Sequence, residues 1–164
     1  MAKPIGTLGN VPTTTVGGVS VPFNIPANAT MFSLYAGINN GVDFSAMIKA
    51  NGTSAYQVTA GKTLYIYALK AIYSASNSSA SQNAITIGYS SSSLAGFGQA
   101  SAPSSPTYMF NQAPGDYGLI PIVTSPDYTF ESPLDFTVPA NDYPFMGSSG
   151  NQVNMTVMFL CYEV

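Results

Sequence analysis

Proline and glycine interrupt this chain so often that a helix of about twelve residues, the usual length in globular proteins, has few places to form. The 164 residues include 12 prolines and 15 glycines. A proline inside a helix removes a backbone hydrogen bond and clashes with the preceding turn, whereas short strands fit between such interruptions. Because the length is that of one domain, the sequence predicts a single all-β domain.

Two runs have the pattern of long central strands. Residues 152–164 alternate between apolar and polar in their first half and are apolar on both faces in their second half, which is typical of a strand that begins at a wet edge and ends between two layers. One of these faces contains Val153, Met155, Val157, Phe159 and Cys161. In residues 62–73, strict alternation gives two faces, one with Tyr65, Tyr67, Leu69 and Tyr73 and the other with Leu64, Ile66, Ala68 and Ile72.

Shorter runs give the remaining strand candidates. They lie at 16–23, 30–36, 42–49, 55–58, 83–89, 108–111, 118–124 and 134–138. About ten strands at this spacing predict a sandwich or a barrel. The stretches 74–81 and 90–106, rich in serine, have loop composition, and we expect them to be exposed connections at one end.

The domain boundary is expected near residue 22. Residues 1–22 are rich in glycine and threonine and are predicted to form an N-terminal arm or edge strand, laid on a neighbouring copy or frayed; both arrangements stay open. Residues 23–164 then form the single β-sandwich domain.

A short pattern occurs three times. Ile25-Pro26-Ala27-Asn28, Val58-Thr59-Ala60-Gly61 and Val138-Pro139-Ala140-Asn141 each combine a β-branched residue, proline or threonine, alanine, and a residue that tolerates a positive φ. Because the spacing is irregular, the pattern is not a solenoid repeat. It predicts a reused corner at which the chain turns tightly into its next strand.

The charge balance excludes two classes of partner. Charged residues make up 7% of the chain, which has four lysines and no arginine and a formal net charge of −3. Nucleic acids and anionic membranes are bound by clustered lysine and arginine, so we expect neither. The longest apolar stretch, 64–69, is far shorter than the roughly 18 residues that span a bilayer, and the chain does not begin like a secretory signal.

The composition excludes most classes of catalytic site. Ser-His-Asp and Cys-His sites and zinc sites need histidine or several cysteines, but the chain has no histidine and one cysteine, Cys161, whose apolar neighbours predict a buried thiol. Gly61-Lys62-Thr63 lacks the first glycine and the following helix of a phosphate-binding loop. We therefore expect no enzymatic activity and no cofactor.

Acidic residues gather in one part of the sequence. They are Asp116, Asp127, Glu131, Asp135 and Asp142. We interpret them as solvated loop charge and expect no metal; a calcium site is the alternative, and a hydrolase that uses two of them is a further class.

Aromatic residues are the remaining candidates for a site. Those in or near the loop-rich region are Tyr89, Phe97, Tyr108, Phe110, Tyr117 and Tyr128. Tyrosines at loop ends stack on sugar rings or anchor protein interfaces. We favour sandwich corners and subunit contacts over a ligand site.

Low charge also predicts self-association, because little electrostatic repulsion keeps copies apart. We therefore expect a permanent homo-oligomer. The stretch Tyr56-Gln57-Val58-Thr59-Ala60-Gly61-Lys62-Thr63-Leu64-Tyr65-Ile66, followed by Ile85-Thr86-Ile87-Gly88-Tyr89, resembles the V-P-A-G-K, hydrophobic strand, then I-G-Y pattern of small jelly-roll proteins on tailed-phage particles. These include the head-decoration, or cement, proteins; Thr59 replaces the first proline of the pattern.

The resemblance implies a fold and a role. The fold is an antiparallel jelly-roll-like β-sandwich of about 8–10 strands. The role is that of a non-enzymatic structural protein, most simply a trimer, seated on the capsid surface of a virion and bound to the major capsid protein. The alternative is a receptor- or glycan-binding module of a phage tail fibre or spike, which shares the fold and composition.

Overall fold

The computed structural model describes residues 13–16, 19–22, 25–39, 43–75, 84–96, 99, 101–111, 128–149 and 153–164, and within these ranges it contains strands and turns but no helix. The strands are β1 (Thr13–Val16), β2 (Val19–Pro22), β3 (Thr30–Asn39), β4 (Asp43–Ala46), β5 (Ile48–Lys49), β6 (Leu64–Ala75), β7 (Ala84–Ser90), β8 (Thr107–Asn111), β9 (Tyr128–Val138), β10 (Tyr143–Ser149) and β11 (Val153–Glu163).

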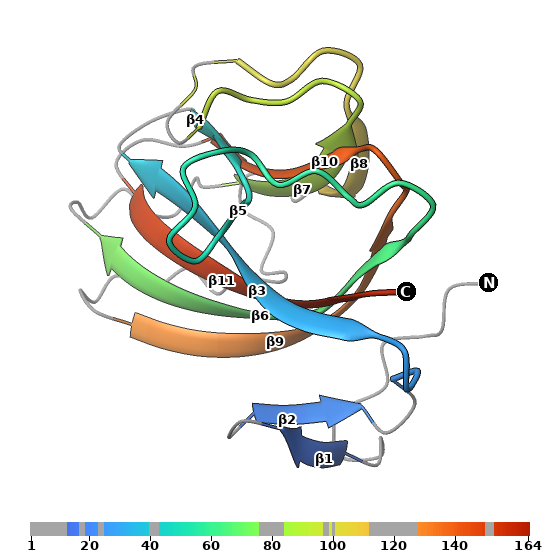
Figure 1. Cartoon of the computed structure of the whole chain (residues 1–164). Helices are drawn as coiled ribbons and strands as arrows, with labels where there is room; N and C mark the ends of the chain where they lie inside the picture. The colour runs from blue at the N-terminus through green and yellow to red at the C-terminus, as the bar shows by residue number, and fades with distance from the viewer. Residues whose placement is uncertain are drawn as a thin grey trace.

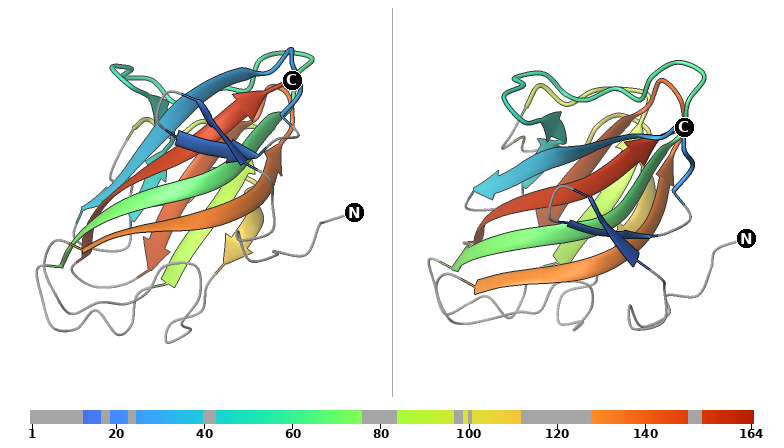
Figure 2. Two further views of the ribbon diagram at one scale, coloured as in Figure 1. Left: turned by 90° about the horizontal axis from the view of Figure 1, so that it is seen from below. Right: turned by 60° about the horizontal axis from the view of Figure 1, so that its bottom comes forward.

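Nine of these strands form two antiparallel sheets that pack as layers (Figure 1). The five-stranded sheet has the order β5-β3-β11-β6-β9, and the four-stranded sheet has the order β4-β10-β7-β8. The strands β1 and β2 pair with each other in a separate two-stranded sheet, which Figure 2 shows on the outer side of the five-stranded sheet.

The strand order is that of a ribbon folded back on itself. β3 pairs with β11, β4 with β10, β6 with β9, and β7 with β8, so the ribbon turns in the segment 91–106. The pairs β11–β6 and β10–β7 then join its two halves into sheets. This is the order of a jelly roll, and it confirms the predicted antiparallel jelly-roll-like sandwich.

The core lies between the sheets. Leu34 and Ala36 of β3 and Phe159 of β11 are fully buried and face Ile87 and Met146 of the other sheet in one apolar cluster. On β11 the alternation was predicted correctly, since Val157, Phe159 and Cys161 are all buried. On the other face of this strand Met158, Leu160 and Tyr162 are half-buried, and the two-stranded sheet β1–β2 lies on that side (Figure 2).

A β-bulge in β6 corrects the predicted faces of that strand. Leu160 of β11 pairs with Ala68 while the next residue, Cys161, pairs with Ile66, so Tyr67 is the extra residue. A bulge shifts the alternation by one position. Leu69 is therefore buried together with Leu64 and Ile66, not on the face of the tyrosines.

Other strand predictions also need correction. Residues 55–58 are not a strand, although Tyr56 and Val58 are buried and donate their backbone N–H groups to Met47 and Asp142. The predicted strand 42–49 is broken at Met47 into β4 and β5, and β10 was not predicted. The candidate at 118–124 lies outside the described residues.

The segment 91–106 is not simply an exposed connection. Leu94 and Pro103 are buried, and Phe44 of β4 exchanges two backbone hydrogen bonds with Gln99. The segment thus covers the edge of β4, and a covered edge is protected from pairing with other chains.

Candidate functional site

The three recurring corners are hydrogen-bonded turns. The backbone N–H groups of Ala29, Lys62 and Asp142 donate to the carbonyls of Pro26, Thr59 and Pro139, at 2.9, 3.0 and 3.3 Å. The third turn residue has a positive φ at Gly61 (76°) and Asn141 (67°), as the composition predicted. At Asn28 the described backbone shows no positive φ, so this corner turns without it.

These turns meet at one end of the sandwich. Across the five-stranded sheet, the register aligns Thr30, Glu163, Leu64 and Val138 in one row. The turns directly precede Thr30, precede Leu64 and follow Val138, so all three lie at the end marked by the C-terminus in Figure 1. We call residues 26–28, 59–61 and 139–141 the corner surface; all are exposed except the half-buried Ala140, and none is charged.

The carboxylate of Glu163, on the last strand, links β11 to the second of these turns. Its Oε1 accepts hydrogen bonds from the Tyr56 hydroxyl and, at 2.9 Å, from the Thr59 backbone N–H, and its Oε2 accepts from the Thr59 hydroxyl at 2.8 Å. The side chain is only 5% exposed. A buried carboxylate requires such donors, so this one fixes the turn at Thr59 against the last strand.

The pKa values follow from these contacts. Burial alone raises the pKa of Glu163, but the hydrogen bonds from Tyr56 and Thr59 and the charge of Lys62 outweigh burial and lower it. Burial, together with the adjacent Glu163 carboxylate, raises the pKa of Tyr56. Glu163 is therefore ionised and engaged at neutral pH, which is the state of a structural carboxylate and not of a general acid.

Further bonds join the second and third turns of the corner surface. Val58 exchanges backbone hydrogen bonds with the segment Asn141–Asp142, and Thr63 exchanges two with Val164. The Lys49 ammonium lies 4.6 and 4.8 Å from the ring centroids of Phe32 and Tyr56, so it makes cation–π contacts with both rings. The hydrogen bonds fix the second and third turns against each other and against the end of β11.

The predicted aromatic candidates do not form one site. Tyr108 of β8 is 47% exposed, and its ring lies edge-on to that of Phe145. Tyr89 and Phe110 are half-buried and pack against the core. Tyr128 lies on β9, but its side chain is outside the described part, as are Phe97 and Tyr117. Tyr108 is thus the one candidate that the structure places on the surface.

A second small core lies under the segment 91–106. Leu94, Ala46 and Phe145 are buried there, with Phe44 packed against them. The rings of Phe145 and Phe44 fill the space where a Cβ atom of Gly88 or Gly147 would stand. The outer side of the four-stranded sheet is therefore partly closed by its own chain.

The acidic residues do not converge in the described part of the chain. Asp135 is exposed on β9, and Asp142 follows the third corner. Glu131 pairs in register with Lys70, but its side chain lies outside the described part of the structure. Asp116 and Asp127 lie outside it entirely. Among the described residues no three acids, cysteines or histidines are grouped as metal ligands.

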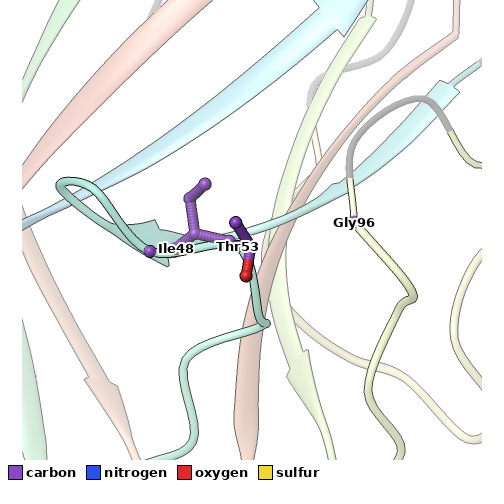
Figure 3. A pocket seen from close by; sticks show the side chains of 4 residues that line it. Ile48, Thr53 and Gly96 are labelled. Atoms are coloured by element: carbon purple, nitrogen blue, oxygen red, sulfur yellow. The ribbon is translucent and has the colours of Figure 1, made fainter.

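A shallow hollow lies where the turn after β5 approaches the segment 91–106. It has a volume of about 260 Å³ and is lined by Ile48, Gly52, Thr53 and Gly96 (Figure 3). Small-molecule sites usually have 300–1,000 Å³ and several convergent polar groups. The hollow has one polar side chain, so it does not meet this description.

Sequence reasoning missed the importance of Tyr56 and Glu163. Tyr56 and Thr59 lie in the stretch that carries the phage-protein resemblance, which is the one sequence signal that pointed to them. Their shared partner, Glu163, is 104 to 107 residues further along the chain. Comparisons with protein-family models, with curated proteins and with solved structures found no match. Among the described residues, no helix is long and apolar enough to cross a membrane.

Proposed function

We propose that this chain is a non-enzymatic structural protein of a virion, a decoration or cement protein that binds an assembled capsid as a homo-oligomer. The observation that carries the proposal is the corner surface, nine residues without a charged side chain from three turns of one pattern at one end of a jelly roll, two of which are hydrogen-bonded to each other and to the end of β11. A preorganised surface loses little conformational entropy on binding. Several copies held in an oligomer add avidity across neighbouring shell subunits.

The resemblance supplies the type of partner. It implies a shell of major capsid protein beneath the chain and three chains in the oligomer. A neutral surface fits this role, because contact with a large assembled partner then depends on shape and buried area and little on salt.

The test uses tailed-phage heads assembled without this chain. Purified chain should co-sediment with them and raise the temperature at which they open. Ala60→Arg places a charge on the exposed corner surface and should reduce binding at least tenfold. Ser101→Arg, at an exposed position outside that surface, is the matched control and should bind normally. Heads that never retain the chain contradict the proposal.

The alternative, a glycan- or receptor-binding module, is favoured by one observation, the exposed ring of Tyr108. Such a module should bind glycans on an array, and Tyr108→Ala should abolish that binding while Ala60→Arg leaves it unchanged. Glycan binding with this pattern, without retention on heads, would favour the alternative.

A further inference from the structure

Two of the three turns of the corner surface are hydrogen-bonded to each other. Val58, which precedes the second turn, donates its backbone N–H to the Asp142 carbonyl and accepts from the N–H of Asn141, each at 3.0 Å. The side-chain amide of Gln57 donates to the Asn141 carbonyl at 2.8 Å. In the described part of the chain, the hydrogen bond of the first turn stays within that turn. The second and third turns therefore form one unit, which we call the paired turns (59–61 and 139–141).

The tip of the second turn exposes main chain and little side chain. Ala60 and Gly61 are both exposed, and no hydrogen bond in the described part of the chain uses their backbone N–H or carbonyl groups. A Cβ atom at Gly61 would have nothing within 4 Å. The Thr59 hydroxyl, which is the one polar side-chain group of this turn, donates to the buried Glu163. Because glycine lets another backbone approach closely, a partner can reach these main-chain groups directly.

The chemistry of the paired turns indicates a polypeptide as the occupant. Exposed main-chain donors and acceptors are the groups with which an extended protein segment pairs. A glycan is held by the face of an aromatic ring, and the paired turns contain no aromatic residue. A ligand with phosphate groups needs clustered cations, whereas the charged residues that directly follow these turns, Lys62 and Asp142, have opposite signs and are half-buried.

We propose that the partner contributes an uncharged polypeptide segment, which packs on the main chain of Ala60 and Gly61 beside the third turn, while the first turn stays outside the contact. The inference deepens the proposed function and rests on it for the partner, a subunit of the capsid shell. The hydrogen bonds within the paired turns, and those from Thr59 to Glu163, fix this contact before binding. Little conformational entropy is therefore lost when the segment docks.

The test adds bulk without charge and measures retention on tailed-phage heads assembled without this chain. Gly61→Asn suits the backbone, because Asn141 has the same place in the pattern with a φ of 67°, and it fills the open space at the tip. Retention should fall about tenfold or more, since the added side chain overpacks a close contact. Ala60→Gln should have the same effect and keeps the test decisive if Gly61→Asn fails to fold. Ala27→Gln, the same substitution at the same exposed place in the first turn, is the matched control and should leave retention unchanged.

The opposite outcomes are distinct, once circular dichroism melts have established that each variant is folded. Normal retention of a folded Gly61→Asn or Ala60→Gln variant, on heads that retain the wild type, overturns the inference and leaves the proposed function standing. An equal loss with Ala27→Gln also overturns it, because the first turn would then take part in the contact. Binding to a glycan array that Gly61→Asn abolishes would overturn the polypeptide as the occupant. Heads that never retain the wild type contradict the proposed function, and the inference with it.

Discussion

At the scale of single residues, Glu163 and Cys161 lie two positions apart on β11 and show how neighbouring positions of one strand serve different ends. Glu163 is a buried charge that three hydrogen bonds hold in place. Cys161 is a buried thiol within the apolar core, and burial raises its pKa. Glu163 ties the turn at Thr59 to the sheet, whereas Cys161 fills space in the core.

The contacts of Glu163 predict how stability depends on pH. Its pKa in the folded chain is below the usual 4.5, so its ionised form stabilises the fold above that value, and this contribution is lost as the pH falls through the lowered pKa. Glu163→Gln should cost about 1–3 kcal/mol at pH 7 and less at pH 3. Urea unfolding of both proteins at several pH values measures the difference. A difference that is the same at pH 7 and pH 3 contradicts this account.

Cys161 should be chemically inert in the folded chain. A thiol reacts as its thiolate, and here the thiol is fully buried and its pKa is raised, with burial as the main cause. A colorimetric thiol reagent should give no signal with native protein at pH 8 and one equivalent per chain in urea. Rapid reaction without denaturant would show that β11 is accessible.

The burial of Cys161 was predictable from its apolar neighbours, whereas that of Glu163 was not. A carboxylate at the end of an apolar strand is normally solvated, and its hydrogen-bond donors come from a turn 104 positions earlier in the chain. Local sequence carries no information on such a pair without an alignment. The turn itself was predictable, because alanine followed by glycine or asparagine indicates a backbone with positive φ.

At the scale of strands and loops, two glycines restrict the chain for different reasons. A Cβ atom at Gly88 of β7 would lie 2.5 Å from the carbonyl oxygen of Thr107 and 2.8 Å from the ring of Phe145. Gly61 has open space around it but a φ of 76°. The first is a packing requirement and the second is a conformational one.

These two requirements predict different costs. Gly61→Ala should destabilise the chain by about 1 kcal/mol, the cost of a left-handed conformation for an L-residue. Gly88→Ala should cost about 2–3 kcal/mol, because a backbone oxygen cannot move aside without breaking the β7–β8 pairing. Thermal melts of the two variants give the comparison. Equal losses would mean that the Phe145 ring and β8 adapt easily.

There is a physical reason why the sequence did not predict β10 or the bulge in β6. β10 contains Pro144 and Gly147, which indicate a loop, but the proline lies near the start of the strand and the glycine makes room for Phe44. The bulge at Tyr67 also has no local signature, since its position depends on the register of β11. Alternation therefore found β6 and β11 but only the last part of β9, and it did not find the residue at which β6 changes face.

At the scale of the whole molecule, the jelly roll makes the first and last strands of the sandwich domain depend on each other. β3 and β11 are the first and last strands of the ribbon and pair along their full length, and β11 also pairs with β6. β1 and β2 pair only with each other. The class of fold was predictable from spacing and composition, but the strand order follows from contacts that no local pattern contains.

This arrangement predicts an asymmetric response to truncation. Removal of residues 1–22 should leave a domain that melts cooperatively within a few degrees of the full chain, because no strand of the two sheets is lost. Removal of residues 155–164 should abolish cooperative melting, because β11 lies between β3 and β6. Near-ultraviolet circular dichroism on heating distinguishes the two. A cooperative melt after the second truncation would mean that the remaining strands form a core without β11.

The hydrogen bonds between Val164 and Thr63 have a practical consequence. They hold the end of the chain beside the corner surface, so a peptide tag, fluorophore or cargo domain fused after Val164 would emerge into the very contact by which the protein is proposed to dock. A fusion partner placed ahead of β1 avoids that obstruction. Loss of capsid retention upon C-terminal but not N-terminal fusion would map the docking side before any point variant is made.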